Sequence, residues 1–165
     1  MWGNLLSALI GGLLGGGGAI ATQIVRHRLD DGRTRRALAG AFAGEIAAIC
    51  AIARRRDYLG GATQLLEHVR QTGQPTRLVL SITQDYFQIY RSNAGALGLL
   101  PPTIAEQVAL FYTQVKSLIE DVLPTAPNPQ DAATAEQAIQ EQIALLQDTL
   151  RLGDDLVTRL REVRS

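Results

Sequence analysis

The chain has 165 residues, and its 16 lysines and arginines are balanced by 16 aspartates and glutamates. This length corresponds to about one domain, and the lack of a net positive charge argues against a dedicated nucleic-acid-binding protein. We therefore expect no nucleic-acid partner. The single cysteine, Cys50, cannot form an intrachain disulfide, and its isoleucine neighbours predict a small buried side chain.

The N-terminal segment from Trp2 to Val25 contains no charged side chain. As a helix rising about 1.5 Å per residue, Leu5 to Val25 would span about 30 Å, which matches the hydrocarbon thickness of a bilayer. The pattern predicts a single transmembrane anchor with its basic flank over residues 1–28, followed by a helical domain over residues 29–165.

Several arginines follow this segment, whereas no lysine or arginine precedes it. The positive-inside rule then places the N-terminus outside and the domain in the cytoplasm. Two alternatives remain open. Ala19-Ile20-Ala21 resembles the cleavage site of a signal peptide, and the segment could also be a buried glycine-rich helix of a soluble protein. The residues expected to contact lipid headgroups are Arg26, Arg28, Arg33, Arg35 and Arg36.

Small residues recur at every fourth position of the uncharged segment. On a helix they would form a ridge that allows another membrane helix to approach closely, although a span can also simply tolerate small residues. We expect a helix-contact face, with another copy of the chain or a different membrane protein as the partner. This ridge consists of Gly3, Ser7, Gly11, Gly15 and Ala19.

The following region predicts helices with interruptions at glycine and proline. A break is expected at Asp30-Asp31-Gly32, and a helix from about Arg33 should run to a second break at Gly60-Gly61. A continuation over residues 62–72 should end at Gly73-Gln74-Pro75. The apolar stripe expected to face the core consists of Leu38, Phe42, Ile46, Ile49 and Ala53.

The middle of the chain predicts a connector and two helices. Residues 77–82 lack a partner strand and are expected to be a connector, residues 83–90 form a short helix, and residues 93–98 carry stop signals. The next helix should open at Pro101-Pro102, with Thr103 and Glu106 as a capping box.

The last helix should begin near Gln130, after the linker of residues 124–129, with Asn128 as its cap. Its apolar seam contains Gly153, which would permit a close helix crossing or would simply weaken the helix. The whole pattern predicts an all-α protein in which an antiparallel bundle of about four helices follows the anchor. The seam consists of Ile139, Ile143, Leu146, Leu150, Gly153, Val157 and Leu160.

The block from Tyr86 to Val122 contains aromatic residues, Asn93, Gly98-Leu99-Leu100 and two prolines in a distinctive order. It resembles a group of small bacterial proteins that combine this block with a glycine-rich N-terminal span, an arginine-rich flank and a Glu-Ile pair, here Glu45-Ile46. The resemblance covers most of the chain. It implies an anchored helical architecture and assigns neither an activity nor catalytic residues.

No catalytic, cofactor-binding or metal-binding pattern is evident. His27 and His68 lack partners at metal-ligand spacing, and the chain has neither a phosphate-binding loop nor a nucleophile elbow. The adjacent carboxylates Glu120-Asp121 and Asp154-Asp155 point about 100° apart on a helix and are expected to be solvated. Three tyrosines could converge on a pocket, although core positions are the simpler interpretation: Tyr86, Tyr90 and Tyr112.

The sequence thus favours a non-catalytic, membrane-tethered interaction or scaffold module, or an accessory subunit of a membrane complex. No cofactor is expected, and the partners would be the lipid bilayer and either another membrane protein or a second copy. The alternative is an oligomer that perturbs the membrane or forms a pore through the small-residue ridge. An enzyme of unrecognised type is the third hypothesis.

Overall fold

The structure is a computed structural model that describes residues 31–80 and 86–164. Within these ranges the regular elements are all helices, which confirms the all-α prediction for this part of the chain. The predicted anchor from Trp2 to Val25 lies outside the described residues. The elements are the N-terminal helix Asp31–Arg55, α2 Tyr58–Thr72, α3 Gln88–Asn93, the 3-10 helix η1 Ala94–Leu99, α4 Pro102–Val122 and α5 Ala132–Arg164.

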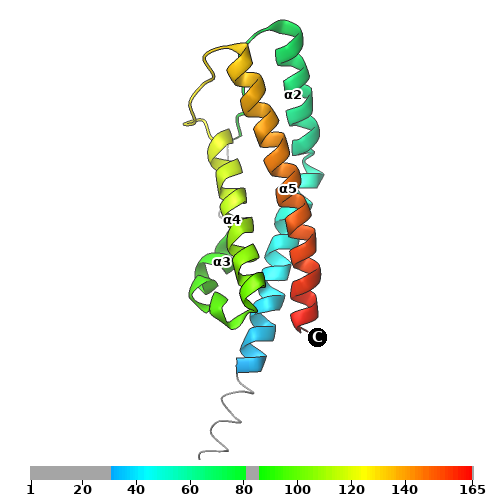
Figure 1. Cartoon of the computed structure of the whole chain (residues 1–165), viewed down its shortest axis with the longest axis vertical. Helices are drawn as coiled ribbons and strands as arrows, with labels where there is room; N and C mark the ends of the chain where they lie inside the picture. The colour runs from blue at the N-terminus through cyan, green and yellow to red at the C-terminus, as the bar shows by residue number, and fades with distance from the viewer. Residues whose placement is uncertain (1–30, 81–85, 165) are drawn as a thin grey trace, which may run out of the picture.

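Helix α5 runs the full length of the domain, with the N-terminal helix and α2 in succession along one side and α4 along another (Figure 1). Ion pairs show the directions, because Arg54 contacts Asp154 at 2.6 Å and Arg70 contacts Glu136 at 2.8 Å. In α4, Gln114 bonds to Thr149 and the earlier Gln107 bonds to the later Arg159. Among the long helices described, α5 therefore runs against the other three. The expected antiparallel bundle of about four helices is confirmed only in part, because the N-terminal helix and α2 follow one another along the same side of α5.

The break between the N-terminal helix and α2 lies at Asp57 and not at Gly60-Gly61, so that prediction was wrong. Asp57 adopts a left-handed conformation with φ 49°, and its carboxylate accepts a hydrogen bond from the Gly60 amide at 3.2 Å. Aspartate tolerates this conformation and caps helices well, whereas both glycines fit inside the first turn of α2. The break expected at Asp30-Asp31-Gly32 is also wrong where the structure describes it, because Asp31 and Gly32 are helical.

Two predicted helix caps are not formed. Helix α4 begins after Pro101 without a side-chain cap, so Thr103 and Glu106 do not form a capping box there. Helix α5 is capped by Asp131, whose carboxylate accepts a hydrogen bond from the Thr134 amide at 2.7 Å, and not by Asn128. Near the start of α5 both Asn128 and Asp131 are cap-type residues, and the helix begins directly after Asp131.

The segment after α2 is a connector, as predicted, and the described part of it contains no strand. The Leu80 amide donates to the Val122 carbonyl at 2.8 Å, and Arg77 holds the end of α4. The Arg77 guanidinium donates to the carbonyls of Leu123 and Pro124 and to the Asn128 side chain, at 2.8–3.0 Å. The helix expected over residues 83–90 is instead α3, which begins only at Gln88.

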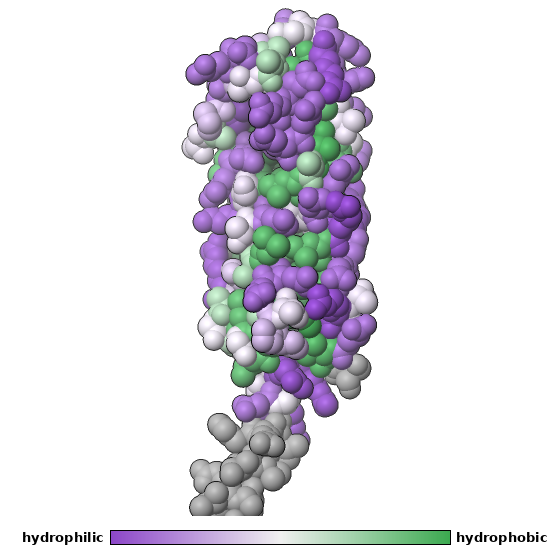
Figure 2. Space-filling model, viewed as in Figure 1, coloured by the Kyte–Doolittle hydropathy of each residue, from purple (hydrophilic) through white to green (hydrophobic). Residues whose placement is uncertain are grey.

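The N-terminal helix Asp31–Arg55 is long and apolar enough to cross a membrane, judged by length and composition. In this structure, however, its apolar stripe packs into the domain. Leu38, Phe42 and Ile46 are at most 5% exposed and share a core with α4 and α5. The apolar character of this helix is therefore accounted for by the bundle core. Polar residues cover most of the face seen in Figure 2, with smaller apolar areas between them.

The described residues form two separate core clusters. The larger one joins the N-terminal helix, α4 and the C-terminal half of α5. The smaller one joins α2 to the start of α5 through Leu66, Val69, Ala135 and Ile139. The predicted seam of α5 is therefore buried at its two ends, whereas Ile143, Leu146 and Leu150 between them are only half-buried.

Candidate functional site

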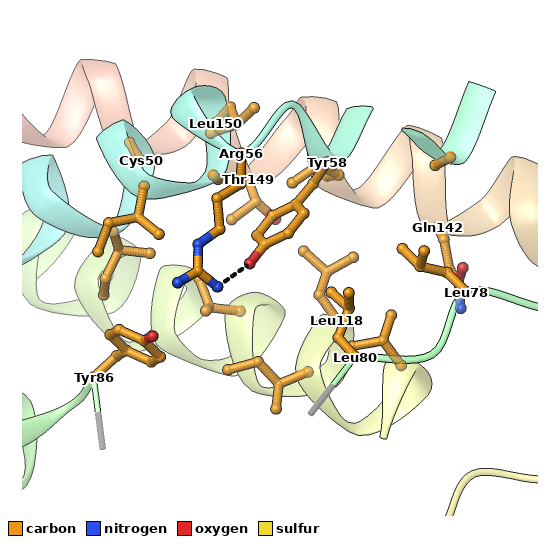
Figure 3. Close-up of a pocket in the computed structure, with 18 of the residues that line it drawn as sticks. Cys50, Arg56, Tyr58, Leu78, Leu80, Tyr86, Leu118, Gln142, Thr149 and Leu150 are labelled. Atoms are coloured by element: carbon orange, nitrogen blue, oxygen red, sulfur yellow. Dashed lines mark hydrogen bonds between the residues drawn. The ribbon is translucent and has the colours of Figure 1, made fainter. Parts of the chain in front are cut away.

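A pocket of about 260 Å³ lies where the two core clusters separate (Figure 3). Its walls come from the N-terminal helix, the start of α2, the connector, α4 and α5. Most of the lining side chains are aliphatic, and many are half-buried because they face the pocket. Six that define its apolar wall are Ile49, Ile52, Leu118, Ile119, Leu146 and Leu150.

Arg56 and Tyr58 lie over this pocket from the junction between the N-terminal helix and α2 (Figure 3). The Arg56 guanidinium donates to the Tyr58 hydroxyl at 3.0 Å, and this hydrogen bond raises the pKa of Arg56. The Arg56 side chain is exposed. Among the residues that the structure describes, no carboxylate forms an ion pair with it. The pocket thus has one cation, Arg56, beside a mostly apolar wall.

The inner wall carries few polar groups. The Thr149 hydroxyl is 3% exposed and is satisfied by the Leu145 carbonyl at 2.7 Å and the Gln114 side chain at 3.2 Å. Cys50 is buried as predicted, and burial raises the pKa of its thiol to about 11. A thiol of that pKa is almost entirely protonated at neutral pH and is a poor nucleophile.

Gly153 provides the close helix crossing that the sequence offered as one alternative. A Cβ atom built there would lie 2.5 Å from Cys50 Sγ and 2.9 Å from Phe111 Cε2. These distances are too short for real contacts, so α5 approaches the N-terminal helix and α4 closely only because residue 153 has no side chain. Cys50 and Phe111, which Gly153 faces at this crossing, also line the pocket.

A carboxylate inside the apolar stripe of the N-terminal helix organises the neighbouring region. Glu45 accepts hydrogen bonds from the amides of Ile89 and Tyr90, at 2.7 and 3.0 Å, and from the Tyr112 hydroxyl at 2.5 Å. It therefore caps α3 from a different helix. Burial, followed by the bond to Glu45, raises the pKa of Tyr112 well above its usual value.

The three tyrosines singled out in the sequence do not converge on one site. Tyr90 and Tyr112 stack with ring centroids 4.1 Å apart, and Tyr112 is buried in the core. Tyr86 instead lines the pocket. Sequence reasoning missed the pocket, the Arg56–Tyr58 pair and the role of Glu45. Of these features, only Glu45 could have been noticed in the sequence, because it is an acidic residue three positions after Phe42 on the apolar stripe.

The predicted membrane-facing residues are only partly described. The ridge of Gly3, Ser7, Gly11, Gly15 and Ala19 lies outside the described residues, as do Arg26 and Arg28. Arg33, Arg35 and Arg36 are exposed on the first turns of the N-terminal helix. Their proposed contact with lipid headgroups remains a prediction.

The remaining polar candidates do not assemble into a reactive site. Asp154 pairs with Arg54, and Asp155 pairs with Arg159 at 3.5 Å. Within residues 31–80 and 86–164, no group of three or more His, Cys, Asp or Glu side chains is placed to hold a metal ion. His68 is exposed. The chemistry available at the pocket is therefore recognition of an apolar group together with a negative charge.

No protein-family model matches the chain, and comparisons with curated proteins and with solved structures gave no match.

Proposed function

We propose that this chain is a non-catalytic, membrane-tethered helical module whose domain, residues 29–165, works by binding at the cytoplasmic face of a bacterial inner membrane. Its partner would be another membrane protein, within a larger complex, or a second copy of the chain. The observation that carries the proposal is the uncharged stretch from Trp2 to Val25 followed at once by an arginine-rich flank.

The geometry of the domain supports a short tether. Asp31 lies six residues after Val25, and a chain extends at most about 3.6 Å per residue, so the domain begins within about 20 Å of the span. A domain held this closely keeps one end near the lipid headgroups. Lateral contacts with other membrane proteins would therefore use its long sides.

The charges at that end also suit an anionic surface. The N-terminal helix begins and α5 ends at the same end of the domain (Figure 1). On these two segments the exposed arginines outnumber the exposed carboxylates Asp31 and Glu162; the arginines are Arg33, Arg35, Arg36 and Arg161. A basic residue close to anionic lipid contributes about 1 kcal/mol to membrane attraction. This end would consequently be drawn toward the inner leaflet.

A reporter fused after Ser165 tests the tether and its orientation. A reporter that works only in the cytoplasm should be active in the membrane fraction, and one that works only in the periplasm should be silent. Periplasmic activity would overturn the orientation and favour the signal-peptide alternative. Soluble cytoplasmic activity would remove the anchor altogether.

Paired substitutions in the ridge test whether the partner is a second copy. Gly15→Ile lies on the four-residue row and should weaken energy transfer between labelled full-length chains in lipid vesicles, because bulky side chains separate the helices. Gly17→Ile adds the same hydrophobicity off the row and should do less. Equal effects, or no energy transfer by the parent, would exclude self-association through the ridge and leave a different protein as the partner.

A further inference from the structure

The pocket interrupts a core that the sequence pattern would have made continuous. At the two ends of the α5 seam, Ile139 is 1% exposed and Leu160 is 0% exposed. Leu146 and Leu150, between them, are half-buried and line the pocket. Unfilled apolar volume lowers the stability of a core, so a purely structural bundle would gain by closing this gap.

The chemistry of the wall specifies what would fill the gap. Its aliphatic side chains come from five segments and favour an apolar occupant, because Thr149, the buried polar residue of the wall, already has its hydrogen-bond partners. A pocket of about 260 Å³ is larger than the engineered apolar cavity of about 150 Å³ that accepts benzene. It is therefore large enough for part of a hydrocarbon chain.

The position of Arg56 adds a second requirement. Its guanidinium lies over the pocket beside the Tyr58 hydroxyl, and no described carboxylate pairs with it (Figure 3). A guanidinium presents a planar fork that matches a carboxylate, and the phenol supplies one more hydrogen-bonding group. An occupant with an apolar tail inward and a carboxylate at Arg56 would satisfy both parts of the pocket.

We propose that this pocket binds a single-chain carboxylate amphiphile, such as a free fatty acid, and not a lipid that remains in the bilayer. The second half of this statement rests on the proposed tether. Cys50 lines the pocket and lies about 30 Å along the N-terminal helix from Asp31, at about 1.5 Å per residue. If the basic end of the domain rests on the membrane, the pocket lies about 30 Å from the lipid headgroups. This height exceeds the thickness of one leaflet, which is about half of a 30 Å hydrocarbon core, so a lipid that remains in the bilayer would not reach the pocket.

The test is a calorimetric titration of octanoate into the full chain held in phosphatidylcholine nanodiscs, with empty nanodiscs subtracted. Octanoate should show saturable binding, and octanol should bind more weakly. Arg56→Gln should weaken octanoate by roughly tenfold and leave octanol unchanged, since one charge-assisted hydrogen bond accounts for about that factor. Arg55→Gln is the matched control, because Arg55 is an exposed neighbour that does not line the pocket.

A second variant separates occupation of the pocket from surface charge. Leu146→Phe enlarges a wall residue and should abolish binding of both octanoate and octanol, while circular dichroism verifies that the helices remain. No saturable octanoate binding by the parent, or equal losses with Arg55→Gln and Arg56→Gln, would overturn the proposal. Competition by phosphatidylglycerol within the disc would assign the pocket to a bilayer lipid and refute the free amphiphile. Neither readout depends on the orientation of the span or on self-association, so these parts of the proposed function can fail independently of the pocket.

Discussion

Gly153→Ala offers the most direct test of how the domain is packed. The added methyl group would lie 2.5 Å from Cys50 Sγ and 2.9 Å from Phe111 Cε2, so either α5 must move outward or these side chains must shift. Overpacking of this kind costs about 1–3 kcal/mol. Alanine recovers up to about 1 kcal/mol of helix propensity. The net expectation is a loss of about 1–2 kcal/mol in the free energy of unfolding.

Gly44→Ala is the matched control, because Gly44 is also helical and a Cβ there meets nothing within 4 Å. That substitution should stabilise the protein by up to about 1 kcal/mol. The same change from glycine to alanine should therefore lower the free energy of unfolding at residue 153 and raise it at residue 44. The measurement is urea unfolding of the full chain in mild detergent, followed by far-ultraviolet circular dichroism.

A double-mutant cycle identifies the contact responsible. In a Cys50→Ala background the sulfur atom is gone, so Gly153→Ala should cost about 1 kcal/mol less than in the parent. The remaining cost would come from Phe111. If Gly153→Ala stabilised the protein as Gly44→Ala does, or if residues 50 and 153 showed no coupling, the close crossing would be refuted.

Three further predictions concern single side chains. Tyr112→Phe removes the hydrogen bond to Glu45 and should lower the free energy of unfolding at pH 7 by about 1–3 kcal/mol, measured by urea unfolding. The folded state raises the pKa of Tyr112, so above about pH 10 the tyrosine loses its proton only in the unfolded chain. The parent should therefore lose stability as the pH rises above about 10, and the Phe variant should lose less. Asp57→Ala removes a cap and places alanine in the left-handed region, so thermal unfolding should show a loss of about 1–3 kcal/mol, whereas Asp57→Asn should be nearly neutral. The Cys50 thiol, with its pKa near 11, should react with a disulfide reagent at pH 8 far more slowly in the native protein than in urea; equal rates would contradict its burial.

Much of the helical architecture could be predicted from the sequence alone. The 3.6-residue spacing of Leu38, Phe42 and Ile46 predicted a buried face, and all three are in the core. The same reasoning placed the seam of α5, which is buried at its two ends. These predictions succeed because a helix converts spacing along the chain directly into a shared face, so the pattern is local.

Features that depend on which helices meet could not be predicted in this way. The helix breaks at Asp57 and not at the more conspicuous Gly60-Gly61. The reason is that the Asp57 carboxylate stabilises the start of α2 as a cap, whereas glycine is tolerated inside a helix at modest cost. Glu45 caps α3 across a gap of more than forty residues in sequence. The pocket exists only where five segments leave a space between them, and the sequence of any one segment does not show this. The sequence therefore determined the apolar faces of the helices, and the tertiary structure decided where those faces meet and where they leave a space, because packing depends on contacts between residues far apart in the chain.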